Sequence, residues 1–264
     1  MLFRSFAAET RAAVEAAHAA GRILLRHFGR VRGIRHKGPK DLVTAADVAA
    51  ERAIARVLSA RFPAIGFLGE EGGRRGSPDA DHWIVDPLDG TSSFVHGLPT
   101  FAVCIALWRA GRVECGVTYL PRLGELFVAE RGRGTFLDGR RLRVSRTRGL
   151  RDAMLILWHD DAVWRDRRLR ERLAALARSA RGVRSEGAGF SLAMVAAGRV
   201  DAYWELSANP WDMAAGMLLV TEAGGRVTDA RGRPLDLGQP TILATNGPLH
   251  AAVLRHLGRS GRMV

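Results

Sequence analysis

The chain has 264 residues, 47% of them hydrophobic, and carries a formal net charge of +13 at pH 7. This length and apolar content suffice for a sizeable core, and no apolar run approaches the roughly 20 residues that a membrane-spanning helix needs, which argues against a membrane partner. The positive charge is almost all arginine, scattered without interleaved aromatic residues or a known nucleic-acid module, so we do not expect nucleic acid to be the main partner.

Helical and alternating apolar patterns predict an N-terminal half, residues 1–145, in which two helices precede a mostly antiparallel sheet. Its predicted elements are a helix at 5–28, a turn or β-arm at 33–43, a helix at 45–62 and strands at 65–68, 82–85, 101–108, 112–119, 125–129, 134–137 and 143–144.

The second half, residues 146–264, alternates strands and helices in an α/β pattern. Its predicted strands are at 153–157, 201–205, 226–228 and 241–244, and its predicted helices are at 166–179, 190–197, 212–223 and 248–257. The seam between the halves is short, so we expect one compact unit with a site between them.

Asp86 and Asp89 follow a predicted buried strand. A strand end followed by a turn lets both carboxylates converge, and it can turn the Leu88 carbonyl inward. Gly90 permits close backbone approach, and Thr91 stands at a helix start, whose N–H groups can bind phosphate. Carboxylate-rich sites suit hard cations such as Mg²⁺, which commonly drive phosphate ester hydrolysis. The pattern therefore predicts a metal-dependent phosphatase.

Further acidic residues stand at element ends. Glu70 comes just after a predicted short strand, and Asp212 opens a predicted helix, where it can cap the helix, face a metal ion, or do both. Thr44 and Asp47 have the spacing of a capping box. In the alternative interpretation Asp47 pairs with Thr91, whose hydroxyl can orient and deprotonate an attacking water.

Other reactive residues form no second catalytic motif. No Gly-x-Ser-x-Gly elbow or cysteine phosphatase loop occurs, which favours direct attack by water. Lys37 and Asp41, on the predicted arm, are expected to shape or screen the metal site. Cys104 and Cys115 have no metal-ligand spacing, and we expect reduced core thiols in a cytoplasmic protein.

Several segments together resemble the inositol monophosphatase family, and they occur in family order from the first helix nearly to the C-terminus. These segments are residues 41–47, 69–71, 86–91, 211–216 and 221–225.

The resemblance implies a layered α-β-α-β-α sandwich, a homodimer, and Mg²⁺-dependent, lithium-sensitive hydrolysis of a phosphate monoester. It implies two or three ions, with Mn²⁺ as a substitute. Glu70, Asp86 and the Leu88 carbonyl would hold one ion, and Asp86, Asp89 and Asp212 a second. Glu70 would also lie near a more weakly bound third ion and the attacking water.

The same resemblance assigns the remaining site residues. Thr91 and Asp47 would activate the water, so the implied catalytic set is Glu70, Asp47 and Thr91. The implied substrate contacts are Asp89, Gly90, Thr91, Ala188 and Glu205, with the N–H groups of Gly90 and Thr91 on the phosphate and Glu205 on inositol hydroxyls.

The substrate remains open within this resemblance. An inositol phosphate or a similar polyol or sugar phosphate is the first hypothesis. Residues 209–212 also look like histidinol-phosphate phosphatases, although Ala188 stands where those tend to have an acid. Nucleotide 3′-phosphatases are a further alternative, but many of them have Lys-Glu where this chain has Ser92 and Ser93. A protein of another class, a nucleic-acid-binding or regulatory protein that retains the fold, is motivated by the charge.

Overall fold

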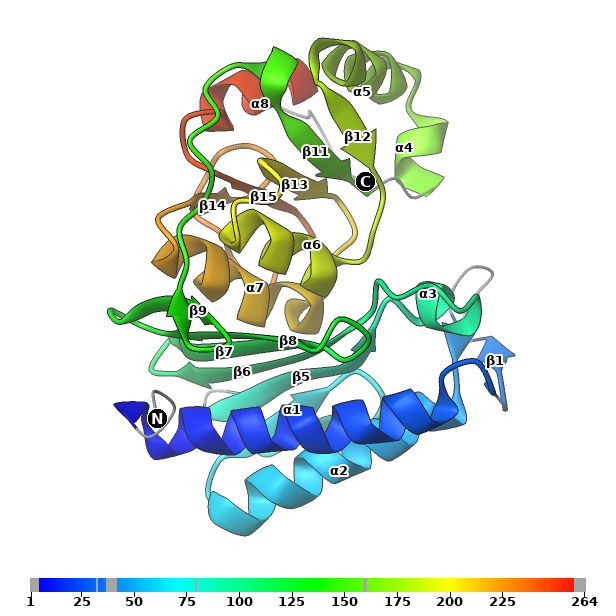
Figure 1. Cartoon of the computed structure of the whole chain (residues 1–264), viewed down its shortest axis with the longest axis vertical. Coiled ribbons are helices and arrows are strands. Elements are labelled where there is room, and N and C mark those ends of the chain that lie inside the picture. Colours follow the sequence, from blue (N-terminus) through cyan, green and yellow to red (C-terminus); the bar gives the residue numbers. More distant parts are fainter. Residues whose placement is uncertain (1–4, 32, 37–41, 79, 159–160, 259–264) are drawn as a thin grey trace.

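Helices and sheets alternate in layers along the long axis of the molecule (Figure 1). The structure, a computed structural model, describes residues 5–258 apart from 32, 37–41, 79 and 159–160. From one end to the other, the layers are a helix pair, a large sheet, a second helix pair, a smaller sheet and a group of outer helices. This order confirms the expected α-β-α-β-α sandwich.

The large sheet is antiparallel except where β3 pairs with β5 in parallel. Its described strands, in spatial order, are β10 (Arg140–Arg141), β9 (Gly134–Leu137), β8 (Glu125–Glu130), β7 (Arg112–Leu120), β6 (Ala102–Arg109), β5 (His82–Asp89), β3 (Gly66–Gly69) and β4 (Gly73–Arg75).

The smaller sheet is mixed, because β11 is parallel to both of its neighbours while the other pairs are antiparallel. Its strands in spatial order are β12 (Gly182–Arg184), β11 (Met154–Leu157), β13 (Ala202–Glu205), β15 (Ile242–Thr245) and β14 (Arg226–Thr228). The chain passes from one sheet to the other between Arg141 and Met154.

The helices form three layers around these sheets. They are α1 (Ala8–His27) and α2 (Ala45–Arg61) outside the large sheet, α6 (Ala188–Ala196) and α7 (Pro210–Glu222) between the sheets, α4 (Asp161–Arg165), α5 (Arg167–Ser179) and α8 (His250–Leu257) outside the smaller sheet, and the short α3 (Thr91–Val95).

Strand alternation divides the apolar residues of the large sheet between two cores. On β6, Val103 and Ile105 pack on the side of α1 and α2, whereas Cys104 and Ala106 face α6 and α7. The side chains that face the central helices are small, so these helices can lie close to the sheet. Cys115 lies in the other core from Cys104, and both thiols are free and buried, as the sequence predicts for reduced cysteines.

The central helix α7 packs against both sheets and therefore sets the distance between them. α7 lies close to the large sheet at Gly116 of β7, where an added Cβ would lie 2.6 Å from the carbonyl oxygen of Ala215. No other residue type fits there without moving α7.

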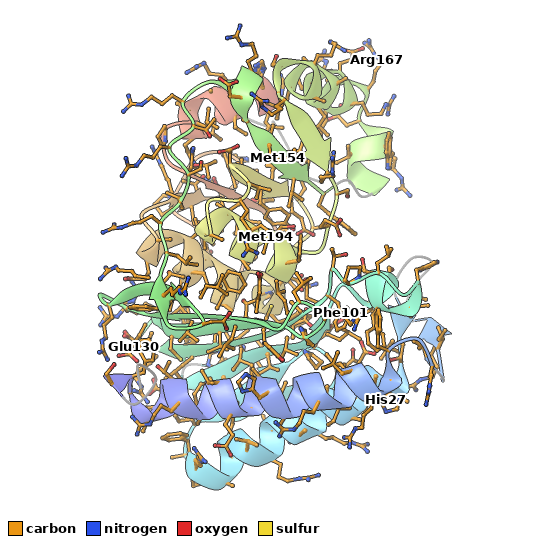
Figure 2. All side chains as sticks on the ribbon, in the orientation of Figure 1. His27, Phe101, Glu130, Met154, Arg167 and Met194 are labelled. Carbon is orange, nitrogen blue, oxygen red and sulfur yellow. The ribbon has the colours of Figure 1, made fainter. Side chains whose placement is uncertain are left out.

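A third core lies beyond the smaller sheet, where its far face packs on α5 and α8. Leu155 and Trp204 are completely buried there. Arg167 of α5 projects from this end of the molecule (Figure 2), where arginines are frequent in the sequence. Within the described residues, no helix is both long and apolar enough to cross a membrane.

Several predicted boundaries differ from the structure. The strand predicted at 143–144 is wrong, because the Val144 N–H donates to the carbonyl of Ala223 at the end of α7, at 3.2 Å, rather than to a neighbouring strand. The short elements β4, β10, β12 and α4 were not predicted. The predicted arm is present as the pair β1 (Arg35–His36) and β2 (Leu42–Val43).

Replacing Gly116 by alanine should lower the free energy of unfolding by about 1–3 kcal/mol, because the new methyl group collides with the α7 backbone. Urea unfolding measures the effect. The matched control is Gly149→Ala, where an added Cβ meets nothing within 4 Å. Equal stability of the two variants would contradict the packing described here.

Candidate active site

A cavity of about 260 Å³ collects residues from both halves of the chain. It lies where β5 and β13 end and where α3, α6 and α7 begin. Its lining residues are Leu42, Glu70, Asp86, Leu88, Asp89, Gly90, Thr91, Ser92, Ser93, Trp158, Gly187, Ala188, Glu205 and Asp212. The catalytic, metal-binding and substrate-contact residues expected from the sequence all line this cavity except Asp47, whose carboxylate lies 3.3 Å from the Thr91 hydroxyl.

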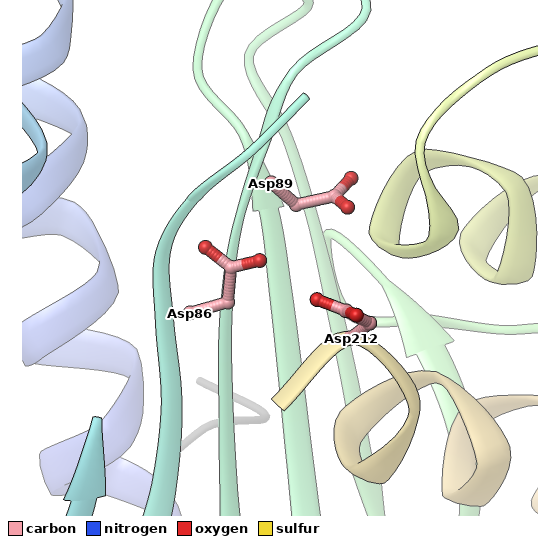
Figure 3. A group of neighbouring side chains, drawn as sticks. All are labelled: Asp86, Asp89 and Asp212. Carbon is pink, nitrogen blue, oxygen red and sulfur yellow. The ribbon is translucent and has the colours of Figure 1, made fainter. Parts of the chain in front are cut away.

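Three aspartates converge in the cavity (Figure 3). Asp86, Asp89 and Asp212 each offer a carboxylate oxygen, and these oxygens all lie within 4.8 Å of one another. Residues three apart on a regular strand point to opposite faces. Here the register of β5 against β6 shifts between Asp86 and Asp89, which brings both carboxylates to one side. The strand therefore runs beyond the predicted end at Val85, as far as Asp89.

Backbone hydrogen bonds hold the two β5 carboxylates in place. Asp86 Oδ1 accepts the Leu88 N–H at 2.8 Å. Asp89 Oδ2 accepts the N–H groups of Gly189 and Phe190, at 3.0 and 3.3 Å, in the first turn of α6. The positive end of that helix favours the ionised form of Asp89. One oxygen of each carboxylate is thus positioned by the main chain.

Asp212 is held by its own helix. α7 begins at Pro210, and the N-cap is Asn209 rather than Asp212. Asp212 is the third residue of this helix, and its Oδ2 accepts the Asn209 N–H at 2.6 Å in a capping box. The sequence interpretation of Asp212 as the N-cap itself is therefore wrong by three positions, whereas its place in the acidic cluster agrees with the sequence interpretation.

The cavity concentrates negative charge away from water. Burial raises the pKa of Asp89 to about 6. Burial, followed by the charges of Glu70, Asp89 and Asp212, raises the pKa of Asp86 well above its ordinary value. Burial and the Glu205 carboxylate do the same to the pKa of Asp212. Such a cluster is unfavourable as it stands, and a bound cation would relieve the repulsion.

The donor set fits a hard divalent cation. The three aspartates offer only oxygen, and Glu70 and Leu88, which line the same cavity, can add a carboxylate and a backbone carbonyl. Oxygen donors of this kind suit Mg²⁺ and Mn²⁺, whereas zinc sites in proteins usually contain histidine or cysteine.

Thr91 connects the cavity to a buried carboxylate. Its hydroxyl lies 3.3 Å from Asp47 Oδ1 and 3.0 Å from the Leu88 carbonyl oxygen. Asp47 Oδ2 accepts the Thr44 N–H at 2.8 Å in a capping box at the start of α2. One oxygen of Asp47 thus caps the helix, as the capping-box interpretation predicts, and the other faces Thr91. Burial raises the pKa of Asp47.

The turn after β5 requires glycine. Gly90 has a φ of +82°, and an added Cβ would lie 2.9 Å from the carbonyl oxygen of Thr100. This conformation starts α3, so the backbone of Gly90 and Thr91 borders the cavity.

Glu205 and Ala188 line the side of the cavity that belongs to the second half. Glu205 ends β13 and accepts hydrogen bonds from the hydroxyls of Tyr203 and, at 3.4 Å, Ser207. Ala188 is the first residue of α6, so the predicted start of this helix at residue 190 is two residues late.

Sequence reasoning missed several lining residues, namely Leu42, Ser92, Ser93, Trp158 and Gly187. Trp158 stands directly after a predicted strand, but nothing in its local sequence marks it as part of a site. Lys37 and Asp41, which were expected to shape the metal site, lie outside the described residues.

Comparisons with known proteins agree with this architecture. A sequence model of the inositol monophosphatase family matches residues 7–262. The inositol-1-monophosphatase of Rhizobium meliloti is 46% identical over 233 residues, which cover 85% of this chain and 87% of that protein. The Nus factor SuhB of Pseudomonas aeruginosa is 43% identical over 251 residues, which cover 92% and 93%. The solved structure of extragenic suppressor protein suhB from Bartonella henselae superposes with a TM-score of 0.91 at 40% identity, covering 97% of this chain and 100% of that one.

The raised pKa of Asp89 makes metal stabilisation depend on pH. Without divalent cations, the folded protein binds a proton at Asp89 up to about pH 6, whereas the unfolded chain releases it at the ordinary pKa of 3.8. The contribution of Asp89 to the free energy of unfolding is therefore full below pH 3.8 and is lost as the pH rises through about 6. Mg²⁺ should therefore raise the Tm more at about pH 7.5 than at about pH 5. Thermal unfolding with Mg²⁺ or with a chelator measures this difference.

A test variant and a matched control accompany that experiment. Asp212→Asn should diminish the Mg²⁺-induced rise, whereas Asp236→Asn, on an exposed loop, should keep it. A rise that is equal at both pH values, or unchanged in the Asp212 variant, would contradict a cation site at this cluster.

Proposed function

The chain belongs to the inositol monophosphatase family, and we propose that it hydrolyses a phosphate monoester of inositol or a similar polyol by direct attack of water. The observation that carries this proposal is the convergence of Asp86, Asp89 and Asp212 in one cavity beside the first turn of α3. Acidic clusters of this kind serve metal-dependent phosphoryl transfer, in which positioning and charge stabilisation do most of the work.

In this proposal the carboxylates hold the metal. Glu70, Asp86 and the Leu88 carbonyl would bind one Mg²⁺, and Asp86, Asp89 and Asp212 would bind a second. Glu70 would also lie beside a weaker third ion, and Mn²⁺ would substitute for Mg²⁺. When bound, the ions supply positive charge that stabilises the transition state and the leaving oxygen. We also propose that lithium inhibits the enzyme, and family membership is the support for this part of the proposal.

Thr91 and Asp47 would take the proton of the attacking water. The water donates to Thr91 Oγ1, and Thr91 in turn donates to Asp47 Oδ1, which lies 3.3 Å away. The Thr44 cap fixes the other oxygen of Asp47, so the carboxylate cannot rotate away. A raised pKa makes Asp47 a better base than an exposed aspartate.

The N–H groups of Gly90 and Thr91 would bind the phosphate. The first N–H groups of a helix have no partner within that helix, and they attract anions. Glu205 would accept hydrogen bonds from hydroxyls of the alcohol part, and Ala188 leaves room for its ring. Asp89 adjoins both groups of contacts, because it precedes Gly90 in the chain and accepts the N–H of Gly189, the neighbour of Ala188.

Substrate choice has two alternatives in the same chemistry. Histidinol phosphate is motivated by the residue pattern at 209–212, and nucleotide 3′-phosphates are a weaker candidate. The first hypothesis is favoured because relatives at 44–46% identity are named inositol-1-monophosphatase.

A second candidate function is regulatory binding, because a relative of similar identity is named Nus factor SuhB. The arginines of α5, with Arg167 projecting from the outer layer (Figure 2), offer an anionic partner a surface outside the cavity lining. Such binding should survive substitution in the acidic cluster and weaken steeply with salt, which an RNA-binding titration measures.

A cytoplasmic location and a homodimer remain proposals. The first is supported by two free, buried thiols, which are typical of a reducing compartment, and the second by family membership alone. Light scattering of the purified protein tests the dimer, and cell fractionation tests the location.

The direct test is phosphate release from a panel containing myo-inositol 1-phosphate, histidinol phosphate and a nucleoside 3′-monophosphate. We expect turnover that requires Mg²⁺, disappears in excess chelator, and has its highest kcat/KM on the inositol ester. Full activity in chelator would contradict the mechanism. A higher kcat/KM on histidinol phosphate would change the substrate, and no release from any ester would leave only the regulatory function.

The proposed proton path predicts a contrast between two substitutions at one position. Thr91→Ala should lower kcat by about 100-fold or more, because general-base assistance contributes factors of this order. Thr91→Ser keeps the hydroxyl and should lose far less. Steady-state kinetics with saturating Mg²⁺ measures both. Equal activities of the two variants would rule out a catalytic role for the hydroxyl.

A further inference from the structure

Trp158 lies beside Glu205 at the rim of the cavity. It follows β11 directly, and its N–H donates to the carbonyl of Trp204 in β13 at 2.9 Å. β11 and β13 are parallel, with Leu157 opposite Trp204. The next position along each strand is therefore Trp158 on one and Glu205 on the other, about 5 Å apart in backbone spacing.

Strand alternation turns both side chains toward the cavity. Leu157 and Trp204 lie in the core beside the outer helices, whereas Tyr203, two residues before Glu205, lies in the central core. Side chains alternate along a strand, so Trp158 and Glu205 share the other face, and both line the cavity.

Their exposures differ in a useful way. Glu205 is 7% exposed and is fixed by the Tyr203 hydroxyl, whereas Trp158 is 37% exposed and belongs to none of the buried cores. Leu157, at 4% exposure, anchors this strand end in the outer core instead. The indole of Trp158 is thus not needed to hold the fold, and an exposed indole at a cavity rim is available to a ligand.

The pair combines two recognition elements. A carboxylate accepts hydrogen bonds from hydroxyl groups, and an indole offers a flat apolar surface. Trp158 is the one aromatic side chain among the described residues that line the cavity. A cyclic polyol presents hydroxyls at its edge and C–H groups on its face, so it can satisfy both elements at once. An open-chain polyol has no such face.

We propose that Trp158 is a specificity-determining residue, which packs on the ring face of the leaving alcohol and makes the enzyme select cyclitol or sugar phosphates over open-chain polyol phosphates. This inference rests on the proposed function, since it concerns the alcohol part of the ester that the cavity would cleave.

The test compares kcat/KM on myo-inositol 1-phosphate and on glycerol 2-phosphate. Trp158→Ala should lower the value for the inositol ester roughly tenfold, mainly through KM, and change the value for the glycerol ester by less than about twofold. Trp158→Phe keeps an aromatic face and should lie between the wild type and the alanine variant. Thermal unfolding of each variant verifies that the fold is intact.

Trp164→Ala is the matched control. Trp164 of α4 is 54% exposed and does not line the cavity, so its removal should alter neither value. Equal losses on the two esters in the Trp158 variants, or an unchanged preference, would overturn the role of Trp158 while leaving the phosphatase function standing. Failure of the wild type to hydrolyse either ester would overturn the proposed function and this inference with it.

Discussion

The repulsion among three carboxylates, two of them buried and the third half-buried, is the constraint on which the rest of the structure depends. Asp86, Asp89 and Asp212 come from two elements far apart in the chain, yet their oxygens lie within 4.8 Å of one another. Ionised groups so close together and shielded from water favour protonation over charge, as the raised pKa values indicate. The fold resists this repulsion because β5 is buried between two cores and α7 is clamped between two sheets.

The sequence predicts which residues form this site better than it predicts the strand pairing that brings them together. Asp86 and Asp89 are recognisable because a buried strand, a proline and a glycine surround them. Their convergence also needs the register shift on β5, which depends on pairing with β6 and leaves no local mark. Trp158 escaped prediction for a similar reason, since its neighbour Glu205 becomes adjacent only when β11 and β13, which are separated in the chain by α4, α5, β12 and α6, pair in parallel.

The same limit explains the errors in the fold. Long periodic elements such as α1 were predicted within about three residues, because their apolar spacing is written into the local chain. Residues 143–144 look like a strand but connect the two sheets, and their backbone partner is the end of a helix 79 positions later, at Ala223. The short strand β12 owes its existence to β11 beside it rather than to its own composition.

Two of the acidic residues also serve the start of their own helices. Asp47 and Asp212 are each the third residue of their helix, α2 and α7, and complete a capping box there. A descendant that stopped turning over substrate would still be selected to keep both, because losing either frays a helix that holds a core together. These two aspartates can thus be retained for helix stability after the catalytic activity is lost. Asp86 is the better indicator of a retained activity. Burial of its carboxylate lowers the free energy of unfolding, so selection for stability alone would replace it.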